Sequence, residues 1–461
     1  MNRFLPLLFA ILFQPSPASA NTIPPKLAAD RAAVMGRCAE AVNTDCLVES
    51  IQTYLVSGQD QFRRERVMQA LASTQLFDGD VDQAMASYRQ LSAVSGKAEF
   101  LISYAGTLIL KGDKDDALKS LREADALLTD KQNPVSRLDM TSQSMSIAKA
   151  FADAGSPDEG RAILAEIAEY RHRIPMNPML LALMVQVAKS QAAIGFRDDA
   201  ALYLRQAFDK ALDQEVSLTP EQIFQVFEAW SQIDPKAAAT AAKDLVDALA
   251  VQGPSAFEFA IWTGLSVGLS SSDERATADK NARRSMKDAP ERAFVLQLVP
   301  KLALVLKKNG KVGEAVAMLD DAAAEASALT TPLEKAQTLL VLAEALTGAG
   351  ESAKSEKLLN DILGLGDEPG MQGAMLKHYV SAVPAQFALL GKPDIAYDLA
   401  IKVDEGRRDM AIIMAADKLA VKGDYRQAMR FLAQLHDEIS PMMMAGIAQR
   451  LAGLGNESTT P

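Results

Sequence analysis

One pentapeptide carries residue types that could perform nucleophilic catalysis. The string GLSVG at residues 264–268 matches G-x-S-x-G, the nucleophile elbow of α/β-hydrolases. That chemistry needs a serine on a strand-turn-helix element, with an acid and a histidine later in the chain. Residues 257–262 could pass for the strand, and His378 and His436 do come later. Because the sequence shows no βαβ alternation and both histidines fall in helical segments, we expect Ser266 to lie in a helix without a catalytic role.

An acidic run and three histidines are the candidates for metal chemistry. The run DGDVD at residues 78–82 resembles the start of a calcium loop, but it lacks the glycine that should follow its third acid. Its twelfth position is Arg89, where a calcium loop has Glu. His172, His378 and His436 lie far apart, and none has a partner at helical spacing. We therefore expect a turn at 78–82, no metal site and no cofactor.

The chain has two cysteines, Cys38 and Cys46, and both lie near its start. Residues 27–42 and 46–56 are expected to form two helices joined by a short turn, so the cysteines flank that turn. In an oxidising compartment such a pair is usually a disulfide. It would staple the first hairpin, which we expect to lack a neighbour on one side. Two free buried thiols are the alternative.

The N-terminus has the features of a secretory signal peptide. Arg3 supplies a positive charge, residues 4–13 are apolar, and Ala18-Ser19-Ala20 is a small-residue cleavage site. We predict cleavage after Ala20 and a periplasmic or secreted protein. No later segment has the ~18 uninterrupted apolar residues of a membrane span. The formal net charge of −11, with no basic stripe, argues against nucleic acid and anionic membranes as partners.

A repeat determines which elements must position these residues. An alanine is followed by a glycine after seven residues, an alanine after five more, and a large apolar residue after another four. The five complete copies are Ala72-Gly79-Ala84-Tyr88, Ala105-Gly112-Ala117-Leu121, Ala188-Gly195-Ala200-Leu204, Ala303-Gly310-Ala315-Leu319 and Ala416-Gly423-Ala428-Leu432. Three altered copies begin at Ala148, Ala343 and Pro384.

The glycines are predicted to mark the turns of helical hairpins. Before Gly310 an apolar segment ends in two lysines, and after it apolar residues recur at i, i+3, i+4 and i+7. Glycine accepts the positive φ with which helices commonly end. Asp80, Asp113 and Asp424 follow such glycines and are expected to cap the second helix.

A helix-turn-helix unit of ~34 residues with Gly and Ala at these intervals resembles the tetratricopeptide repeat. The resemblance covers about 70–435 and implies an all-α solenoid of stacked hairpins forming a superhelix. The motif fades between 210 and 290, where degraded turns are expected near Asp234-Pro235 and at 270–273. The expected organisation is a signal peptide (1–20), an N-terminal capping hairpin (21–60), repeats (61–210), degenerate repeats (211–290), repeats (291–438), and a C-terminal capping helix and tail (439–461).

The resemblance also implies a binding face. In this family the first helix of each hairpin lines an inner groove, and the residue after its alanine should point there. The corresponding residues are Ser73, Gly106, Lys149, Lys189, Leu304, Glu344, Ala385 and Asp417. Lys149 and Lys189 could hold a carboxylate-bearing partner, or be two solvated lysines. Glu344 and Asp417 make a later part of the face acidic.

These observations favour an exported, non-catalytic scaffold that binds a peptide or protein partner in its groove, in cell-envelope assembly or secretion. The alternative is an exported enzyme or accessory subunit acting on an envelope polymer or an ester. A third possibility is a small-ligand carrier that uses Ile102, Ile109 and Leu110. The run of three methionines at 442–444 is expected to pack in the last helix or to form a peptide-binding patch.

Overall fold

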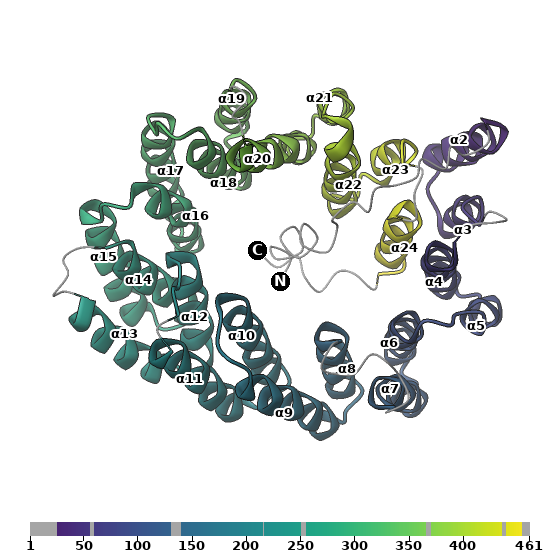
Figure 1. Cartoon of the computed structure of the whole chain (residues 1–461), viewed down its shortest axis with the longest axis horizontal. Coiled ribbons are helices and arrows are strands. Elements are labelled where there is room, and N and C mark those ends of the chain that lie inside the picture. Colours follow the sequence, from purple (N-terminus) through teal and green to yellow (C-terminus); the bar gives the residue numbers. More distant parts are fainter. Residues whose placement is uncertain are drawn as a thin grey trace. The chain divides into compact units, whose positions relative to one another are not determined.

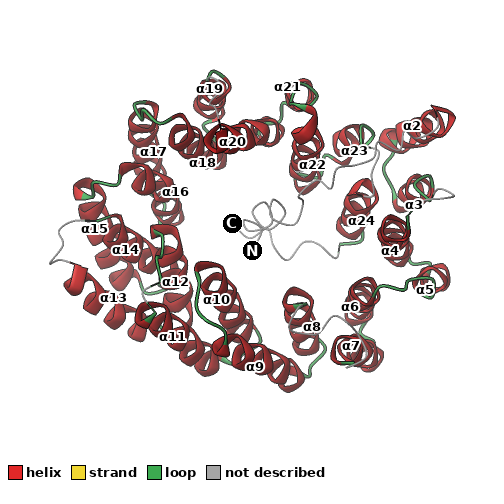
Figure 2. Ribbon diagram, viewed as in Figure 1, coloured by secondary structure: helices red, strands yellow, loops and turns green. Residues whose placement is uncertain are grey.

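The computed structural model describes residues 25–55, 60–130, 140–214, 216–249, 255–365, 370–435 and 439–453. Over these ranges every regular element is an α-helix (Figure 2). The predicted signal peptide with its cleavage site, His436 and the tail from residue 454 lie outside the described residues. None of the described helices combines the length and the apolar character that a membrane span requires.

The chain divides into two compact units. Unit 1 comprises residues 1–134 and 381–461, and unit 2 comprises residues 135–380. The helices of unit 1 are α2 (Pro25–Glu40), α3 (Thr44–Gln52), α4 (Gln61–Asp78), α5 (Val81–Tyr88), α6 (Val94–Lys111), α7 (Lys114–Thr129), α21 (Pro393–Ala400), α22 (Glu405–Val421), α23 (Tyr425–Leu432) and α24 (Ile439–Leu451). The helices of unit 2 are α8 (Thr141–Asp153), α9 (Pro157–Arg173), α10 (Pro178–Ala193), α11 (Arg197–Asp213), α12 (Pro220–Ile233), α13 (Pro235–Leu249), α14 (Ala256–Gly268), α15 (Ser272–Asp288), α16 (Arg292–Lys308), α17 (Val312–Ser327), α18 (Pro332–Ala349) and α19 (Ser352–Leu363). Helix α20 (Gly370–Leu389) contributes residues to both units.

Within each unit the described helices pair into hairpins that stack on one another, which confirms the predicted all-α solenoid of helix-turn-helix repeats. In unit 2 each even-numbered helix packs on the odd-numbered helix that follows it (Figure 1). The even-numbered helices also pack on one another, from α8 through α10, α12, α14 and α16 to α18. We call these six helices the first-helix layer of unit 2.

The turn glycines have the conformation that the repeat predicts. All eight have φ between 74° and 98°, the left-handed region that glycine enters without steric cost. After each glycine, the next backbone N–H donates to the carbonyl five residues earlier, as from Asp80 to Gln75 and from Asp424 to Leu419. This is the Schellman pattern of helix ends. Asp80 and Asp424 also cap the second helix as predicted, but the Asp113 side chain makes no capping hydrogen bond, so that prediction is wrong.

The skeleton alanines are the contact points of each hairpin. All ten alanines in the five complete copies are at most 3% exposed. In the altered third copy, Gly160 replaces the second alanine. A Cβ at Gly160 would lie 2.4 Å from the Ala148 carbonyl oxygen, so α9 approaches α8 too closely for an alanine. The sequence departure at this position therefore marks a tighter hairpin.

The region 211–290 keeps the hairpin arrangement although its motif has faded. Helices α12 and α13 meet at Asp234, and α14 and α15 are joined by residues 269–271, so both degraded turns lie where the sequence predicts them. At the first turn the Ala237 N–H donates to the Asp234 carboxylate at 3.1 Å. A side-chain cap thus accompanies a turn that has no glycine.

Unit 1 brings the two ends of the chain together. Helix α24 packs against α4 and α3, and α2 packs against α23 (Figure 1). The expectation that the first hairpin lacks a neighbour on one side is therefore wrong. Because such contacts join segments hundreds of residues apart, no local sequence pattern reports them.

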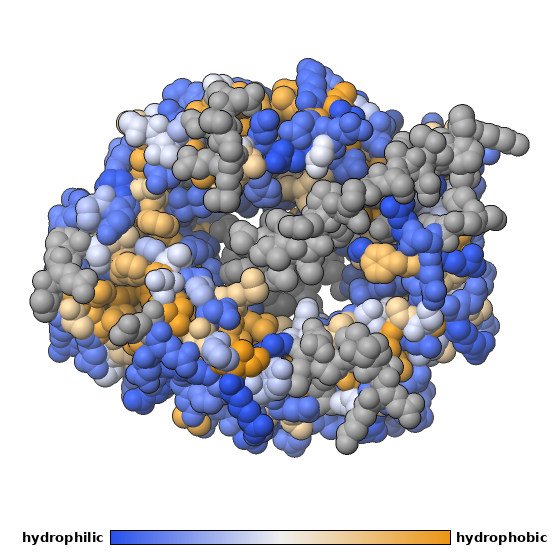
Figure 3. Space-filling model, viewed as in Figure 1, coloured by the Kyte–Doolittle hydropathy of each residue, from blue (hydrophilic) through white to orange (hydrophobic). Residues whose placement is uncertain are grey.

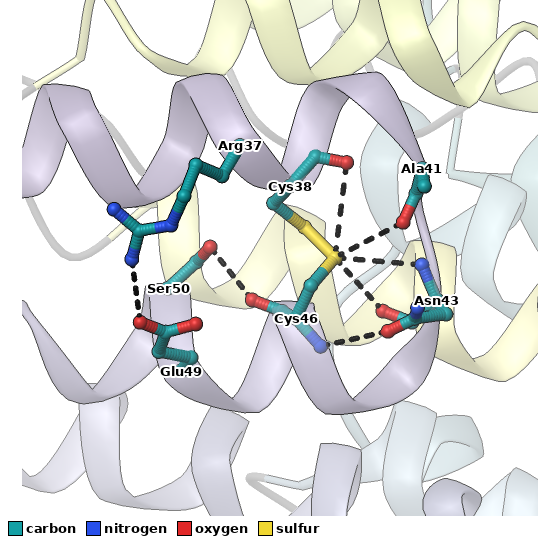
Figure 4. The surroundings of a disulfide bond; sticks show 7 residues. All are labelled: Arg37, Cys38, Ala41, Asn43, Cys46, Glu49 and Ser50. Carbon is teal, nitrogen blue, oxygen red and sulfur yellow. Dashed lines mark hydrogen bonds and ion pairs between the residues drawn. A yellow bond between two sulfur atoms is a disulfide. The ribbon is translucent and has the colours of Figure 1, made fainter.

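The predicted disulfide is confirmed. Cys38 lies in the last turn of α2 and Cys46 in the first turn of α3, and the bond joins the two helices across their short connection (Figure 4). Asn43 caps α3 by accepting from the Cys46 N–H at 2.9 Å. Arg37 and Glu49 form an ion pair of 2.8 Å on the same two helices. The first hairpin is thus fixed covalently and by polar contacts.

Candidate interaction surface

The G-x-S-x-G string is a helix-packing motif. Residues 264–268 form the end of α14, and the segment before them is helical too, so the strand-turn-helix of a nucleophile elbow is absent here. Ser266 is fully buried. A nucleophile must reach its substrate, and a hydroxyl enclosed between helices does not. Ser266 therefore lies in a helix, as predicted, and is buried in the core of the repeat.

The two glycines of the string let α14 approach α12 closely. A Cβ at Gly264 would lie 2.7 Å from the Phe224 carbonyl oxygen and 2.9 Å from the Phe227 Cβ. A Cβ at Gly268 would lie 1.8 Å from the Ser231 Oγ. Backbone approach of this kind needs glycine at both positions, one helical turn apart. The spacing that mimics a catalytic motif is therefore a consequence of helix contact.

The acidic run at 78–82 serves the turn between α4 and α5. Thr44 donates a hydrogen bond to the Asp78 carboxylate, and Asp80 accepts from the Gln83 N–H at 3.0 Å. Gly79 between them supplies the left-handed residue. In the part of the chain that the structure describes, no three His, Cys, Asp or Glu side chains form a cluster that could hold a metal ion.

The two lysines predicted to form a clamp are both ion-paired within the chain. Lys149 on α8 contacts Asp153 at 2.7 Å, one helical turn away. Lys189 on α10 contacts Glu228 on α12 at 3.3 Å, and both side chains are largely covered. An acidic partner would have to displace these carboxylates. The clamp stays a prediction.

The other predicted groove residues are placed unequally. Ser73 on α4 and Asp417 on α22 are half-buried in unit 1, and Glu344 on α18 is half-buried in unit 2. Ala385 on α20 is completely buried, so the rule that the residue after the skeleton position faces a groove is wrong in this repeat. The described structure shows no ligand-binding arrangement among these side chains.

Polar side chains on successive even-numbered helices bind one another. Gln69 on α4 donates to Glu99 on α6 at 2.6 Å, and Gln337 on α18 donates to Gln297 on α16 at 3.3 Å. With Lys189 and Glu228, these pairs are 30 to 40 residues apart, about one repeat. Part of the hydrogen-bonding capacity of these side chains is used inside the chain. The pairs therefore align neighbouring repeats and leave less capacity to bind a polar ligand.

A row of large apolar side chains follows the N-terminal ends of the even-numbered helices in unit 2. One such residue occurs at each of the six helices α10, α12, α14, α16, α18 and α20, at intervals of 37 to 42 residues. The row consists of Met179, Leu218, Phe257, Phe294, Leu333 and Met375. Met179 is 68% exposed, Met375 46% and Phe294 44%, and the other three are half-buried. We call these six residues the edge row.

Near the edge row, backbone N–H groups at the starts of the helices are hydrogen-bonded to side chains of the same chain. The Met176 N–H donates to the Gln214 side chain at 2.7 Å, which links the approaches to α10 and α12. The Ala256 N–H at the start of α14 donates to Glu291, the capping residue of α16, at 2.9 Å. In Figure 3 apolar side chains gather over α10 and around α14. Because these backbone groups are already hydrogen-bonded within the chain, a partner would contact this edge mainly through its apolar side chains.

The edge row is not part of the alanine-glycine skeleton, so the skeleton alone does not predict it. Met179, Phe294 and Met375 each stand nine positions before the first skeleton residue of their repeat. An apolar residue at a constant distance before the skeleton was the available signal. Its exposure could not be read from sequence, because an apolar residue near a helix start commonly packs against the following turn.

One carboxylate in unit 1 performs an unusual capping role. Glu65 on α4 accepts from the Ser92 N–H at 2.8 Å and from the Ala93 N–H at 3.3 Å. Ala93 is the capping residue of α6 and has no side-chain group for that purpose. Desolvation opposes ionisation of Glu65, but the hydrogen bonds from Ser92 and Ala93 outweigh it and lower the pKa of this carboxyl below its ordinary value.

No family model and no curated protein matches the sequence. Among solved structures the chain is similar to Ton1535 from Thermococcus onnurineus NA1, with 12% identity, coverage of 83% of this chain and 99% of that chain, and a TM-score of 0.31. It is also similar to a human IFIT1 dimer with m7Gppp-AAAA, at 12% identity, 92% and 95% coverage and a TM-score of 0.24. A circular tandem repeat protein with novel repeat topology covers 92% of this chain at 14% identity and a TM-score of 0.16. No ligand or partner is transferred from similarities this low.

Proposed function

We propose that this chain is an exported, non-catalytic scaffold that binds an amphipathic helical segment of a protein partner. The edge row of unit 2 is the observation that carries the proposal. Three of its members are exposed and three are half-buried, and apolar surface of this kind commonly marks a protein interaction site. Met and Phe at the most exposed positions suit this use, because methionine adapts its shape and aromatic rings bury much area.

The spacing of the edge row favours a helix as the occupant. Packed neighbouring helices lie about 8–10 Å apart, so residues at one register on successive first helices have about that separation. A partner helix rises ~1.5 Å per residue and repeats its apolar stripe every seven residues, or ~10.5 Å. The apolar positions of one face of a helix can therefore match successive members of the edge row.

Export is supported by two independent features. The first twenty residues have the charge, apolar run and cleavage site of a signal peptide. The Cys38–Cys46 disulfide is typical of an oxidising compartment. We therefore assign the protein to the periplasm or the extracellular space, with envelope assembly or secretion as its setting.

The proposal is tested by photocrosslinking from inside and outside the edge row. A photoreactive phenylalanine analogue replaces Phe294 in one variant and Leu202 in another. Leu202 is 59% exposed on α11 and serves as the matched apolar control. Crosslinks from position 294 in the native envelope should map to an apolar face of a helical segment, and position 202 should give none of them.

A binding measurement completes the test. A synthetic peptide of the crosslinked segment should bind the purified chain, and the triple substitution Met179→Glu, Phe294→Glu and Met375→Glu should weaken binding at least tenfold. The control Leu202→Glu with Leu212→Glu should leave it unchanged. Equal loss in both variants, or a crosslinked segment without an apolar face, would overturn the proposal. Turnover of an ester or envelope polymer by the purified chain would favour the alternative of an enzyme.

A further inference from the structure

The two ends of the chain build one repeat between them. Even-numbered helices form a continuous layer in unit 1, in the order α22, α24, α4, α6, and α24 is the member that joins the late helices to the early ones. On the other side of this layer, α3 packs on α24 and α2 packs on α23. The place of one hairpin is thus filled by three helices from opposite ends of the chain.

We propose that α2, α3 and α24 form a terminal latch, a composite repeat that opens as one cooperative unit while α4 to α7 stay folded. Opening would interrupt the layer of even-numbered helices in unit 1 between α22 and α4. It would also uncover the residues that α24 buries, among them Met444 and Ile447. A scaffold with such a latch can admit or release a partner without unfolding its other repeats.

The connectivity of the chain makes this interface the natural place to open. Neighbouring hairpins within unit 2 follow one another directly in the chain, so an interface that separates there reforms at high effective concentration. No short connection joins α24 to α3 or α4, and the hydrogen-bonded residues Tyr54 and Leu435 are 381 positions apart. Local opening in proteins begins where such constraints are fewest.

Named side-chain contacts hold the latch helices to one another and to their neighbours. The buried Arg31 guanidinium lies 3.7 Å from the centre of the Tyr54 ring and donates to the Thr53 carbonyl at 3.3 Å. This arrangement orients Tyr54 toward Leu435 in the last repeat. On α4, the Arg66 guanidinium lies 3.0 Å from the Met442 sulfur of α24. The Cys38–Cys46 disulfide binds α2 to α3, so these two helices move together.

Hydrogen exchange followed by mass spectrometry tests the latch on the full chain. Ile447→Ala removes a side chain that is 1% exposed in α24, and Leu128→Ala removes an equally buried one in α7. Ile447→Ala should raise amide exchange at least tenfold in α24 and by the same factor in α2 and α3, with α6 and α7 unchanged. Leu128→Ala should accelerate α7 and leave α24 unchanged. Acceleration confined to α24, or shared by α6 and α7, would overturn the proposal.

A conservative variant keeps the test valid if the cavity variants fold poorly. Tyr54→Phe removes one hydroxyl and no packing volume, and Tyr170→Phe does the same at an exposed site in unit 2. Tyr54→Phe should raise exchange about fivefold, the equivalent of ~1 kcal/mol for one hydrogen bond, in all three latch helices. Tyr170→Phe should change none of them. Exchange that changes in α3 alone contradicts a cooperative latch.

Discussion

The Tyr54 hydroxyl donates a hydrogen bond of 3.2 Å to the Leu435 carbonyl oxygen, and both residues are buried. A buried carbonyl that loses its partner costs about 1–3 kcal/mol, so this bond disfavours any arrangement of the chain ends that leaves the Leu435 carbonyl unpaired. Solenoids ordinarily finish in capping repeats with a polar outer face. In unit 1 each end of the chain instead covers the other.

The glycines of the GLSVG string should tolerate no side chain. Gly268→Ala would place a Cβ 1.8 Å from the Ser231 Oγ and 2.6 Å from the Glu228 carbonyl oxygen, so α14 must move away from α12. We expect a loss of about 3 kcal/mol of unfolding free energy, measured by urea denaturation. Ser266→Ala, two residues earlier, removes a buried hydroxyl that has no partner among the described residues and should change stability by less than ~1 kcal/mol.

A helical glycine with free space around it provides the control. A Cβ at Gly106 in α6 would meet nothing within 4 Å. Gly106→Ala should therefore stabilise the protein by about 0.5–1 kcal/mol through helix propensity. If Gly268→Ala behaved like Gly106→Ala, the close approach of α14 to α12 would be disproved.

The turn glycines should respond to backbone conformation and not to space. Gly112 has φ of 87°, and a Cβ there would meet nothing within 4 Å. Gly112→Ala should cost about 1 kcal/mol because an alanine is strained in the left-handed region, and Gly112→Asn should cost less because asparagine enters it more readily. Thermal unfolding of the two variants checks the order. An alanine variant as stable as the wild-type chain would show that the turn can change its conformation.

The hairpins were predictable because each has a local cause. Gly79 and the other turn glycines are needed for a left-handed φ, and the skeleton alanines for close helix contact, so both leave a periodic trace in the sequence. The turn at Asp234 could also be predicted from the sequence, because Asp followed by Pro is a common start of a helix, with Asp as the cap and Pro as the first helical residue. The failed cap at Asp113 shows the limit: residue type sets what a side chain can do, and packing decides whether it does so.

The surfaces were less predictable because they depend on distant contacts. Nothing near α24 in the sequence names α4 as its neighbour, and Ala385 is buried where a rule of register predicts exposure. Gly264 and Gly268 are needed for helix packing, although the string that contains them also matches a catalytic motif. The edge row had a periodic signal, but its exposure depends on how far each helix start extends beyond its neighbours.

Removal of the disulfide should destabilise unit 1. Its closed loop is short, and the loop-entropy model gives about 2.5 kcal/mol for a loop of this size. We expect Cys38→Ser with Cys46→Ser to lose about that much unfolding free energy, measured with urea under oxidising conditions. Reduction of the wild-type chain should give the same shift, and the double variant should then be indifferent to reductant. Equal stability with and without the bond would mean that α2 and α3 are held by their other contacts alone.

Glu65 should make the free energy of unfolding depend on pH in the acidic range. Its pKa is lowered in the folded chain, so it stabilises the fold above its unfolded pKa, and the stabilisation is lost as the pH falls through its folded pKa. Glu65→Gln should cost about 1 kcal/mol at pH 7, because it weakens the hydrogen bonds that cap α6, and almost nothing once the pH lies well below the lowered pKa of Glu65 in the folded chain. Glu274→Gln, at an exposed position in the first turn of α15, is the control. Its free energy of unfolding at pH 7 should differ only slightly from that of the wild-type chain. Urea denaturation at several pH values measures both. A cost of Glu65→Gln that persists undiminished in acid would show that shape, and not the charge of this carboxylate, holds the start of α6.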